Sequence, residues 1–171
     1  MHLELPVLEQ GLEEIRRSPA DDGKVELIVR RPDVDERETV AEALLDTTVG
    51  LVGDRWQGDD PRSQVTVMNA RAVALLAQSA DRWPLAGDQL YVDLDLSPDN
   101  LPPGTRIQVG EAVLEVSDKP HRGCKKFAER FGLDALRFVN STVGYSLNLR
   151  GINTTVVQPG TVRAGDVVRK L

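Results

Sequence analysis

The chain has 171 residues and a formal net charge of −6 at pH 7, with 40% apolar and 28% charged residues. This length and composition predict a folded, single domain over residues 1–171 rather than a disordered chain. The negative charge, without any long basic run, argues against a nucleic-acid partner. No stretch approaches the ~18 consecutive apolar residues of a membrane span and the start lacks a signal peptide, so we expect a cytoplasmic protein without a membrane partner.

The N-terminal part carries both helix and strand signals. Apolar residues recur at helical spacing over residues 5–15, which predicts an amphipathic helix, with a strand from about Gly11 as the alternative. Residues 24–31 are rich in β-branched residues and stop at Pro32, so they predict a strand. Apolar residues at helical spacing in the charged stretch 33–45 predict a surface helix.

The next part begins with a long loop and continues into regular structure. Residues 50–61 contain three glycines, a proline and three acids, which predicts a loop of functional character. β-Branched residues alternate over 62–68 and predict a strand, after which Asn69 is a suitable N-cap for a largely buried helix over 70–78.

Three further strands are predicted in the middle of the chain. Residues 90–96 place leucines and a valine on one face and mostly polar residues on the other, which predicts a half-exposed strand. Residues 105–109 and 112–116 are joined by Gly110 and Glu111, which indicates a tight hairpin.

The last part combines two helices with β-rich runs. A helix is expected from Gly123 to a natural stop at Gly132, and a second over 133–139. The β-rich runs cover residues 145–150, 152–158 and 162–169. Because helices and strands do not alternate regularly, a doubly wound parallel sheet is disfavoured. We predict a mainly β fold with helical insertions (α+β), built as a mostly antiparallel β-barrel.

The single cysteine lies in a basic neighbourhood. Cys124 is surrounded in sequence by His121, Arg122, Lys125 and Lys126. Positive charge lowers the pKa of a thiol toward the thiolate, which is the form that binds soft metals, accepts sulfur or attacks electrophiles. One cysteine also fits a reducing compartment.

A second interpretation makes Cys124 a core residue. It lies at helical spacing with Phe127 and Phe131, and free cysteine is among the most buried residue types. His121 is a possible base for the thiol, but no orienting acid stands at a recognisable spacing. One cysteine and two histidines are too few ligands for a structural zinc site.

Several arginines are candidate anion ligands. Asp54 and Arg55 in the glycine-rich loop can hold a carboxylate, a phosphate or each other. Arg62 starts a predicted strand, and Arg150 follows Asn148 in the segment 148–151. An arginine fork suits a planar anion when it is buried, whereas an exposed arginine is usually a solvated rim residue.

The order of these segments resembles the MOSC domain, the module named for the C-terminus of molybdenum-cofactor sulfurase. The segments are GLVGDRW from Gly50, RSQVTVM from Arg62, LPPGTRIQVGEAVLEVS from Leu101, then Cys124, LRGI from Leu149 and PGTVRAGDVV from Pro159. The resemblance covers residues 50–168, with residues 1–45 as the family's variable N-terminal part.

The resemblance implies a β-barrel-like fold and a cysteine with a sulfur or molybdenum role. In members that carry the cofactor, the equivalent thiolate binds molybdenum and nearby basic residues hold the pterin phosphate. Carried over, Cys124 is the sulfur or molybdenum site, and Arg55, Arg62 and Arg150 are anion-holding residues. Gly123 stands before the cysteine, where many members have a proline.

We therefore expect a protein that binds a molybdopterin-type cofactor or relays sulfur as a Cys124 persulfide. Its partners are then this cofactor or a sulfur donor, with a redox or sulfur-relay protein, and any activity is sulfur transfer or molybdenum-dependent reduction. The candidate catalytic residues are Cys124 and His121, and the candidate cofactor-binding residues are Arg55, Arg62, Arg122, Lys125, Asn148 and Arg150. The alternatives are a non-catalytic anion- or partner-binding module with a buried cysteine, and a thiol hydrolase that uses His121.

Overall fold

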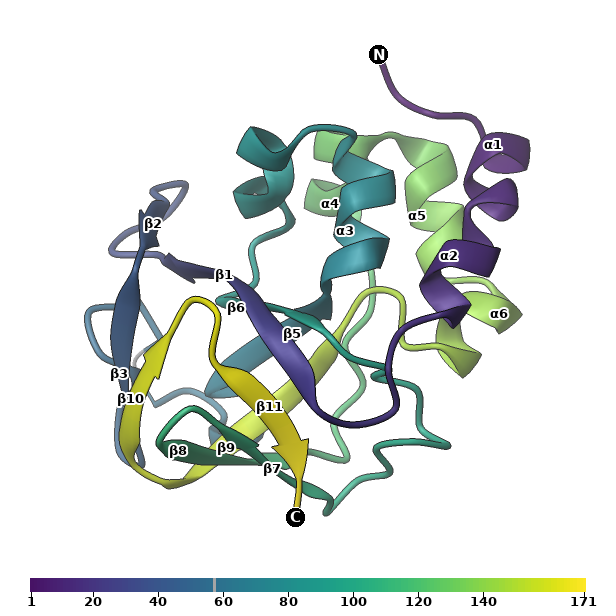
Figure 1. The fold of residues 1–171 in the computed structure, drawn as a ribbon. Helices are drawn as coiled ribbons and strands as arrows, with labels where there is room; N and C mark the ends of the chain where they lie inside the picture. Colours follow the sequence, from purple (N-terminus) through teal and green to yellow (C-terminus); the bar gives the residue numbers. More distant parts are fainter. Residues whose placement is uncertain (57) are drawn as a thin grey trace.

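Seven strands of the chain close into a barrel (Figure 1). The computed structural model describes residues 1–56 and 58–171. Around the barrel the order is β11-β7-β8-β9-β5-β6-β1, and β1 pairs with β11 to close it. The barrel strands are β1 (Gly23–Arg30), β5 (Val65–Asn69), β6 (Leu90–Asp93), β7 (Arg106–Val109), β8 (Ala112–Val116), β9 (Ile152–Gln158) and β11 (Val167–Lys170).

The pairing of these strands is antiparallel with one exception. Strands β5 and β6 run parallel, with Met68 opposite Tyr91, and the other neighbours in the barrel are antiparallel. Closure is made by β11, on which Val168 lies opposite both Gly23 of β1 and Val109 of β7. The predicted mainly β fold with helical insertions and a mostly antiparallel barrel is confirmed.

The alternation of side chains along the strands builds two cores. Successive residues of a strand point to opposite faces. On β6, Leu90 and Val92 join the core inside the barrel, whereas Tyr91 joins a second core beneath the helices. The strand predicted over 90–96 forms over Leu90–Asp93, but Tyr91 is fully buried, so the prediction that the strand is half-exposed is wrong. The predicted alternation of side chains between two faces is correct, but helices cover the face that was expected to be exposed to solvent.

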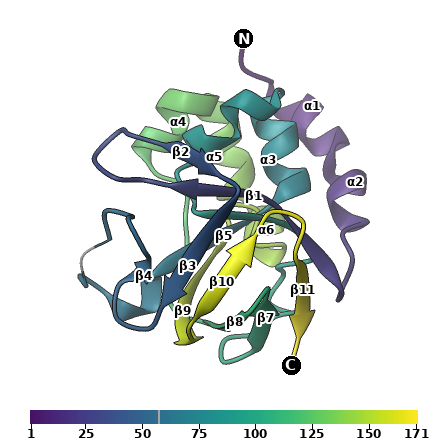
Figure 2. The same ribbon diagram turned by 60° about the vertical axis from the view of Figure 1, so that its left-hand side comes forward.

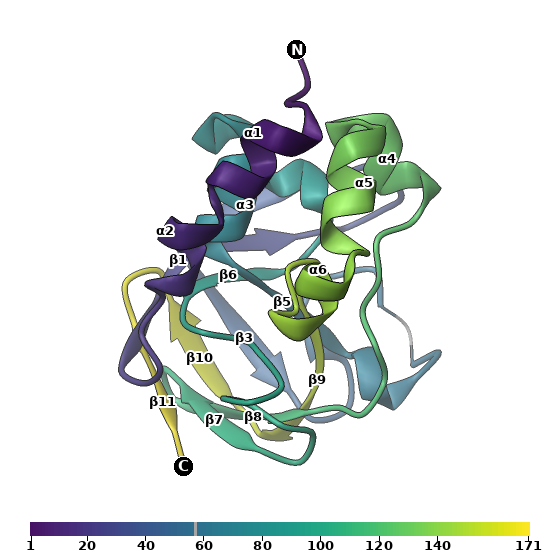
Figure 3. The ribbon, with the colours of Figure 1, turned by 90° about the vertical axis from the view of Figure 1, so that its right-hand side faces the viewer.

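The helices gather over one end of the barrel (Figure 3). They are α1 (Leu5–Gln10), α2 (Leu12–Arg16), α3 (Ala70–Ala77), α4 (Lys125–Phe131), α5 (Leu133–Val139) and α6 (Thr142–Ser146), with 3-10 turns η1 (Pro61–Ser63) and η2 (Ala80–Ala86). The N-terminal helix is confirmed with a break at Gly11, and the alternative strand there is wrong. The side chain of Asn69 accepts hydrogen bonds from the backbone N–H groups of Arg71 and Ala72, as expected of an N-cap.

A smaller sheet lies beside the barrel (Figure 2). It consists of β3 (Glu42–Asp46) between β10 (Gly160–Arg163) and β4 (Gly50–Leu51). Strand β2 (Glu38–Val40) does not belong to this sheet and pairs antiparallel with β1. The helix predicted over 33–45 is therefore wrong. Its apolar residues lie on strands instead. Val40 pairs with Ile28 of β1, and Leu45 of β3 is buried in the core of the barrel.

The β-rich run over 145–150 is also not a strand. Ser141 caps α6 by accepting a hydrogen bond from the N–H of Gly144, and the chain then continues as a loop to Arg150. The hairpin of β7 and β8, the helix over 133–139 and the strand over 152–158 are confirmed. Within the described ranges, each helix is too short or too polar to cross a bilayer.

Candidate functional site

Cys124 opens into a cationic pocket of about 180 Å³. Six of the side chains that line it are positively charged: Arg31, Arg37, Arg55, Lys126, Arg130 and Arg150. Three carboxylates approach these cations, from Asp54, Asp88 and the exposed Asp35. Among the residues that the structure describes, Arg37, Arg55 and Lys126 have no carboxylate within ion-pair distance. A chain with net charge −6 thus concentrates positive charge at its thiol.

A short backbone segment, residues 84–87, holds four of these arginines. Its four consecutive carbonyl oxygens, called here the carbonyl row, each accept a hydrogen bond from a different guanidinium. In order along the row the donors are Arg37 Nε (2.8 Å), Arg130 Nη1 (3.0 Å), Arg150 Nη2 (2.8 Å) and Arg31 Nη1 (3.0 Å). The row includes the end of η2, where cations are favoured, and Pro84 O accepts from the N–H of Gly87 as well as from Arg37.

The arginines of the row come from four separate parts of the chain. Arg31 follows β1, Arg37 precedes β2, Arg130 lies on α4 and Arg150 precedes β9. Burial lowers the pKa of Arg37, and the nearby Arg130 cation lowers it further. The carbonyl row therefore collects like charges that repel one another, an arrangement that a bound anion would relieve.

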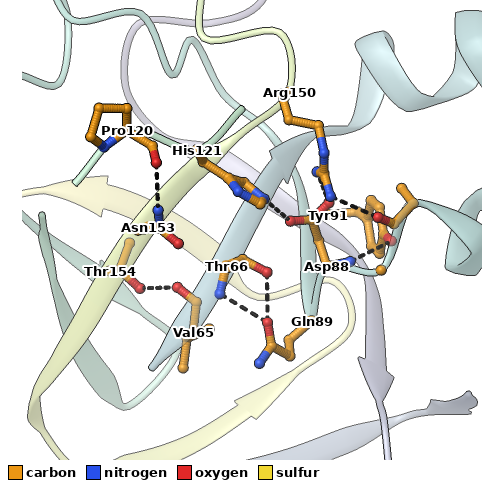
Figure 4. A network of polar contacts seen from close by, with 12 residues as sticks. Val65, Thr66, Asp88, Gln89, Tyr91, Pro120, His121, Arg150, Asn153 and Thr154 are labelled. Carbon is orange, nitrogen blue, oxygen red and sulfur yellow. Dashed lines mark hydrogen bonds and ion pairs between the residues drawn. The ribbon is translucent and has the colours of Figure 1, made fainter. Parts of the chain in front are cut away.

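The residue after the row, Asp88, joins two lining residues (Figure 4). Its carboxylate is completely buried; Oδ2 lies 2.6 Å from Arg150 Nη1 and Oδ1 lies 2.9 Å from His121 Nε2. Burial acts to raise the pKa of Asp88, but the Arg150 cation and the His121 hydrogen bond outweigh it, so the pKa falls well below its usual range. Asp88 is therefore an anion within a buried pair.

The surroundings of His121 favour the neutral imidazole, because they lower its pKa. Burial lowers the pKa of His121, the Arg150 cation lowers it further, and Asp88 acts in the opposite direction. A carboxylate can only accept a hydrogen bond, so Nε2 of the neutral ring carries the proton. This leaves Nδ1 as the acceptor nitrogen of the ring.

Arg31 is anchored by a second buried carboxylate. Asp54 accepts hydrogen bonds from Arg31 Nε at 3.0 Å and Nη2 at 2.7 Å, a bidentate arrangement. Burial acts to raise the pKa of Asp54, yet its hydrogen bonds with Arg31 lower it overall. The sequence left open whether Asp54 and Arg55 pair with each other, and they do not. Asp54 pairs with Arg31, and the exposed Arg55 lines the pocket.

Cys124 itself is exposed, so its interpretation as a core residue is wrong. It is the N-cap of α4, whose buried face is made by Phe127 and Phe131. The preceding Gly123 exchanges two hydrogen bonds with the side chain of Asn140, at 2.9 and 3.0 Å. A Cβ on Gly123 would lie 2.8 Å from atoms of two α5 side chains, which explains a glycine at this position.

The predicted site residues separate into two groups. The pocket brings together Arg55, His121, Cys124 and Arg150. The other four are not among its lining residues: Arg62, Arg122, Lys125 and Asn148. Arg62 is exposed and pairs with Asp60.

A second cavity, of about 170 Å³, lies on another side of His121. Arg122 and Asn148 line it, together with prolines and aliphatic side chains. The Arg122 guanidinium lies 3.7 Å from the centre of the Tyr145 ring, and Asn148 donates a hydrogen bond to the carbonyl of Leu96.

The residues that sequence reasoning missed are Arg31, Arg37, Arg130, Asp88 and the carbonyl row. The proline and the glycine of 84–87 signal a turn, but nothing local to them indicates arginine partners. Across the described part of the chain, no three His, Cys, Asp or Glu side chains form a metal-binding group.

The fold and the pocket define a small α+β barrel protein with an exposed thiol beside a cationic pocket. The family model of the MOSC domain matches residues 54–169, which is more than half of the chain. The chain therefore belongs to the MOSC domain family, as the order of its sequence segments implied.

Solved structures share this fold. The YUAD protein from Bacillus subtilis is 18% identical with a TM-score of 0.65, over 85% of this chain and 93% of that one. YiiM from Escherichia coli is 21% identical with a TM-score of 0.59, over 86% of this chain and 69% of that one. YiiM from Geobacillus stearothermophilus is 17% identical with a TM-score of 0.60, over 87% and 75%. No curated protein matches this chain in sequence.

Proposed function

We propose that the cationic pocket binds a molybdopterin-type cofactor, with Cys124 as the thiolate ligand of the metal. One observation carries the proposal: an exposed thiol opens into the same pocket as six cationic side chains. A soft thiolate suits molybdenum, and arginine forks suit a phosphate. The chemistry of the donor set therefore fits both ends of such a cofactor.

The arginines supply the phosphate end of the site. Arg150 and Arg31 are fixed by buried carboxylates and by the carbonyl row, so their remaining N–H groups are oriented before any ligand arrives. Fixed donors bind an anion without the entropic cost of ordering long side chains. Arg37, Arg55 and Lys126 add charge that no carboxylate of the described residues neutralises by pairing.

Cys124 and His121 supply the reactive end. When bound, the cofactor supplies redox or sulfur-transfer chemistry at its metal. Gly123 holds the backbone of the cysteine against α5, so that the thiol stays at the mouth of the pocket. His121 lines the same pocket, and because its Nε2 faces Asp88, its Nδ1 is the ring nitrogen left to accept a proton.

Metal and pterin analysis of the freshly purified full chain tests this proposal. We expect molybdenum and a fluorescent oxidised pterin in the wild-type protein, loss of molybdenum in Cys124→Ser and loss of pterin in Arg130→Ala. Arg106→Ala is the matched control, because Arg106 is exposed on β7 and pairs with Glu115 outside the pocket. Equal molybdenum in wild-type and Cys124→Ser protein contradicts the proposal. Cyanide-labile sulfur on Cys124 without pterin favours sulfur relay instead.

A further inference from the structure

Asp88 touches neither the solvent nor the thiol, yet each of its oxygens contacts a residue that lines the pocket. Its carboxylate joins Arg150 at 2.6 Å and His121 at 2.9 Å, and its side chain is completely buried. Arg150 lies 62 positions and His121 33 positions away in the sequence, so only the fold brings the three together. Asp88 thus links the anion-binding and proton-accepting parts of the site.

Burying this carboxylate costs free energy that its two partners must offset. Removing a charge from water is expensive, and a buried ion pair is weak evidence of a gain in stability. Arg150 also leaves its Nε without a hydrogen-bond partner among the described residues, although that atom is buried. An unpartnered buried donor is a further cost. Despite both costs, the two terminal nitrogens of Arg150 are held by hydrogen bonds, Nη1 to Asp88 Oδ2 and Nη2 to Ala86 O.

The contact with Asp88 fixes the orientation of the His121 ring. Because Asp88 only accepts, the neutral ring keeps its proton on Nε2 and presents Nδ1 as an acceptor. A carboxylate that orients a histidine in this way is the kind of group that supports a histidine acting as a base. Sequence spacing offered no candidate for this acid, and the fold supplies it from the connection that precedes β6.

We propose that Asp88 is the positioning residue of the pocket, and that it fixes the Arg150 fork for an anion and the Nε2–H tautomer of His121 for proton acceptance. This inference rests on the proposed function. It predicts that neutralising Asp88 weakens anion binding, which is the opposite of what the change in charge alone would do. If Asp88 only reduced the positive charge of the pocket, its neutralisation would strengthen anion binding.

The test uses inorganic pyrophosphate titrated calorimetrically into the full chain. We expect Asp88→Asn to weaken binding by at least about tenfold, because Arg150 loses its buried partner. Asp22→Asn removes the same charge at an exposed position that pairs with Arg169, and should leave the affinity unchanged. Equal or tighter binding by folded Asp88→Asn protein overturns the proposal.

A second measurement needs no variant of Asp88. The chain has two histidines, so the imidazole ¹⁵N spectrum holds two ring systems, and His2→Gln assigns them. We expect the Nε2–H tautomer for His121 in the wild-type protein, and the Nδ1–H tautomer overturns the proposal. If the wild-type protein does not bind pyrophosphate, the proposed function loses its anion site, while the tautomer still decides the role of Asp88.

Discussion

The two cavities that share His121 hold their arginines in different ways. In the cationic pocket, Arg31 and Arg150 are fixed by buried carboxylates and by the carbonyl row. In the second cavity, the exposed Arg122 rests on the half-exposed ring of Tyr145. Nearness to the cysteine in sequence therefore does not make an arginine part of the site. Anchoring by the backbone and by buried acids distinguishes Arg31 and Arg150 from Arg122.

The largest effect should come from removing an anchored arginine. Arg150→Ala leaves the Asp88 carboxylate buried without its main partner, and should lower the free energy of unfolding by about 3–5 kcal/mol. Urea denaturation followed by circular dichroism measures this change. A loss no larger than that of Arg122→Ala would show that anchoring does not distinguish the two cavities.

A smaller effect should follow from filling the space beside the cysteine. In Gly123→Ala, the new Cβ would lie 2.8 Å from Leu136 Cδ1 and from Val139 Cγ2. Overpacking of this kind costs about 1–3 kcal/mol, and relief of the contact should displace Cys124. Urea denaturation and the rate of thiol alkylation check the two consequences. Unchanged stability together with an unchanged rate would mean that Gly123 does not hold the thiol in place.

The free energy of unfolding of the protein should depend on pH through His121. Its pKa is lowered in the folded protein, chiefly because burial disfavours the charged ring and because the Arg150 cation lies nearby, while Asp88 acts in the opposite direction. As the pH falls below the unfolded value of about 6.5, the unfolded chain binds the proton first, so stability decreases until the folded pKa is passed. Thermal unfolding between pH 8 and 5 measures the slope, which His121→Gln should reduce. The same slope in that variant contradicts the assignment.

The smallest effect is expected in the second cavity. Arg122→Ala removes a cation from the exposed face of Tyr145, and should change the free energy of unfolding by about 0.5–1 kcal/mol. Pyrophosphate affinity should remain that of the wild type, because Arg122 is not among the lining residues of the cationic pocket. A tenfold loss of affinity would move the anion site toward the second cavity.

The strands of the barrel were largely predictable because alternation is a local property. The hairpin of β7 and β8, and the helix capped by Asn69, needed only neighbouring residues. The stretch 33–45 failed because its apolar spacing matches a helix, whereas its pairing partners, β1 and β10, lie elsewhere in the chain. Long-range pairing cannot be read from such a window.

The site was predictable only at its cysteine and in part of its cations. Cys124, His121, Arg55 and Arg150 were candidates by type and segment, and the structure places all four on one pocket. The carbonyl row was not predictable, because the oxygen atoms that hold the arginines belong to the backbone of ordinary turn residues. Nothing in the sequence around Asp88 distinguishes it from a surface acid, and only the structure shows that it is buried.

The single parallel pair of the barrel has a consequence for how this site can vary. Parallel neighbours cannot be joined by a tight hairpin and need a crossover connection. Between β5 and β6 that connection is α3 followed by η2, and it ends in the carbonyl row and Asp88. The same passage of chain thus completes the barrel topology and sets the spacing of the arginines. Changes in the length of this crossover would re-space the cations while leaving the strand order intact, which offers one route to different ligands on the same barrel.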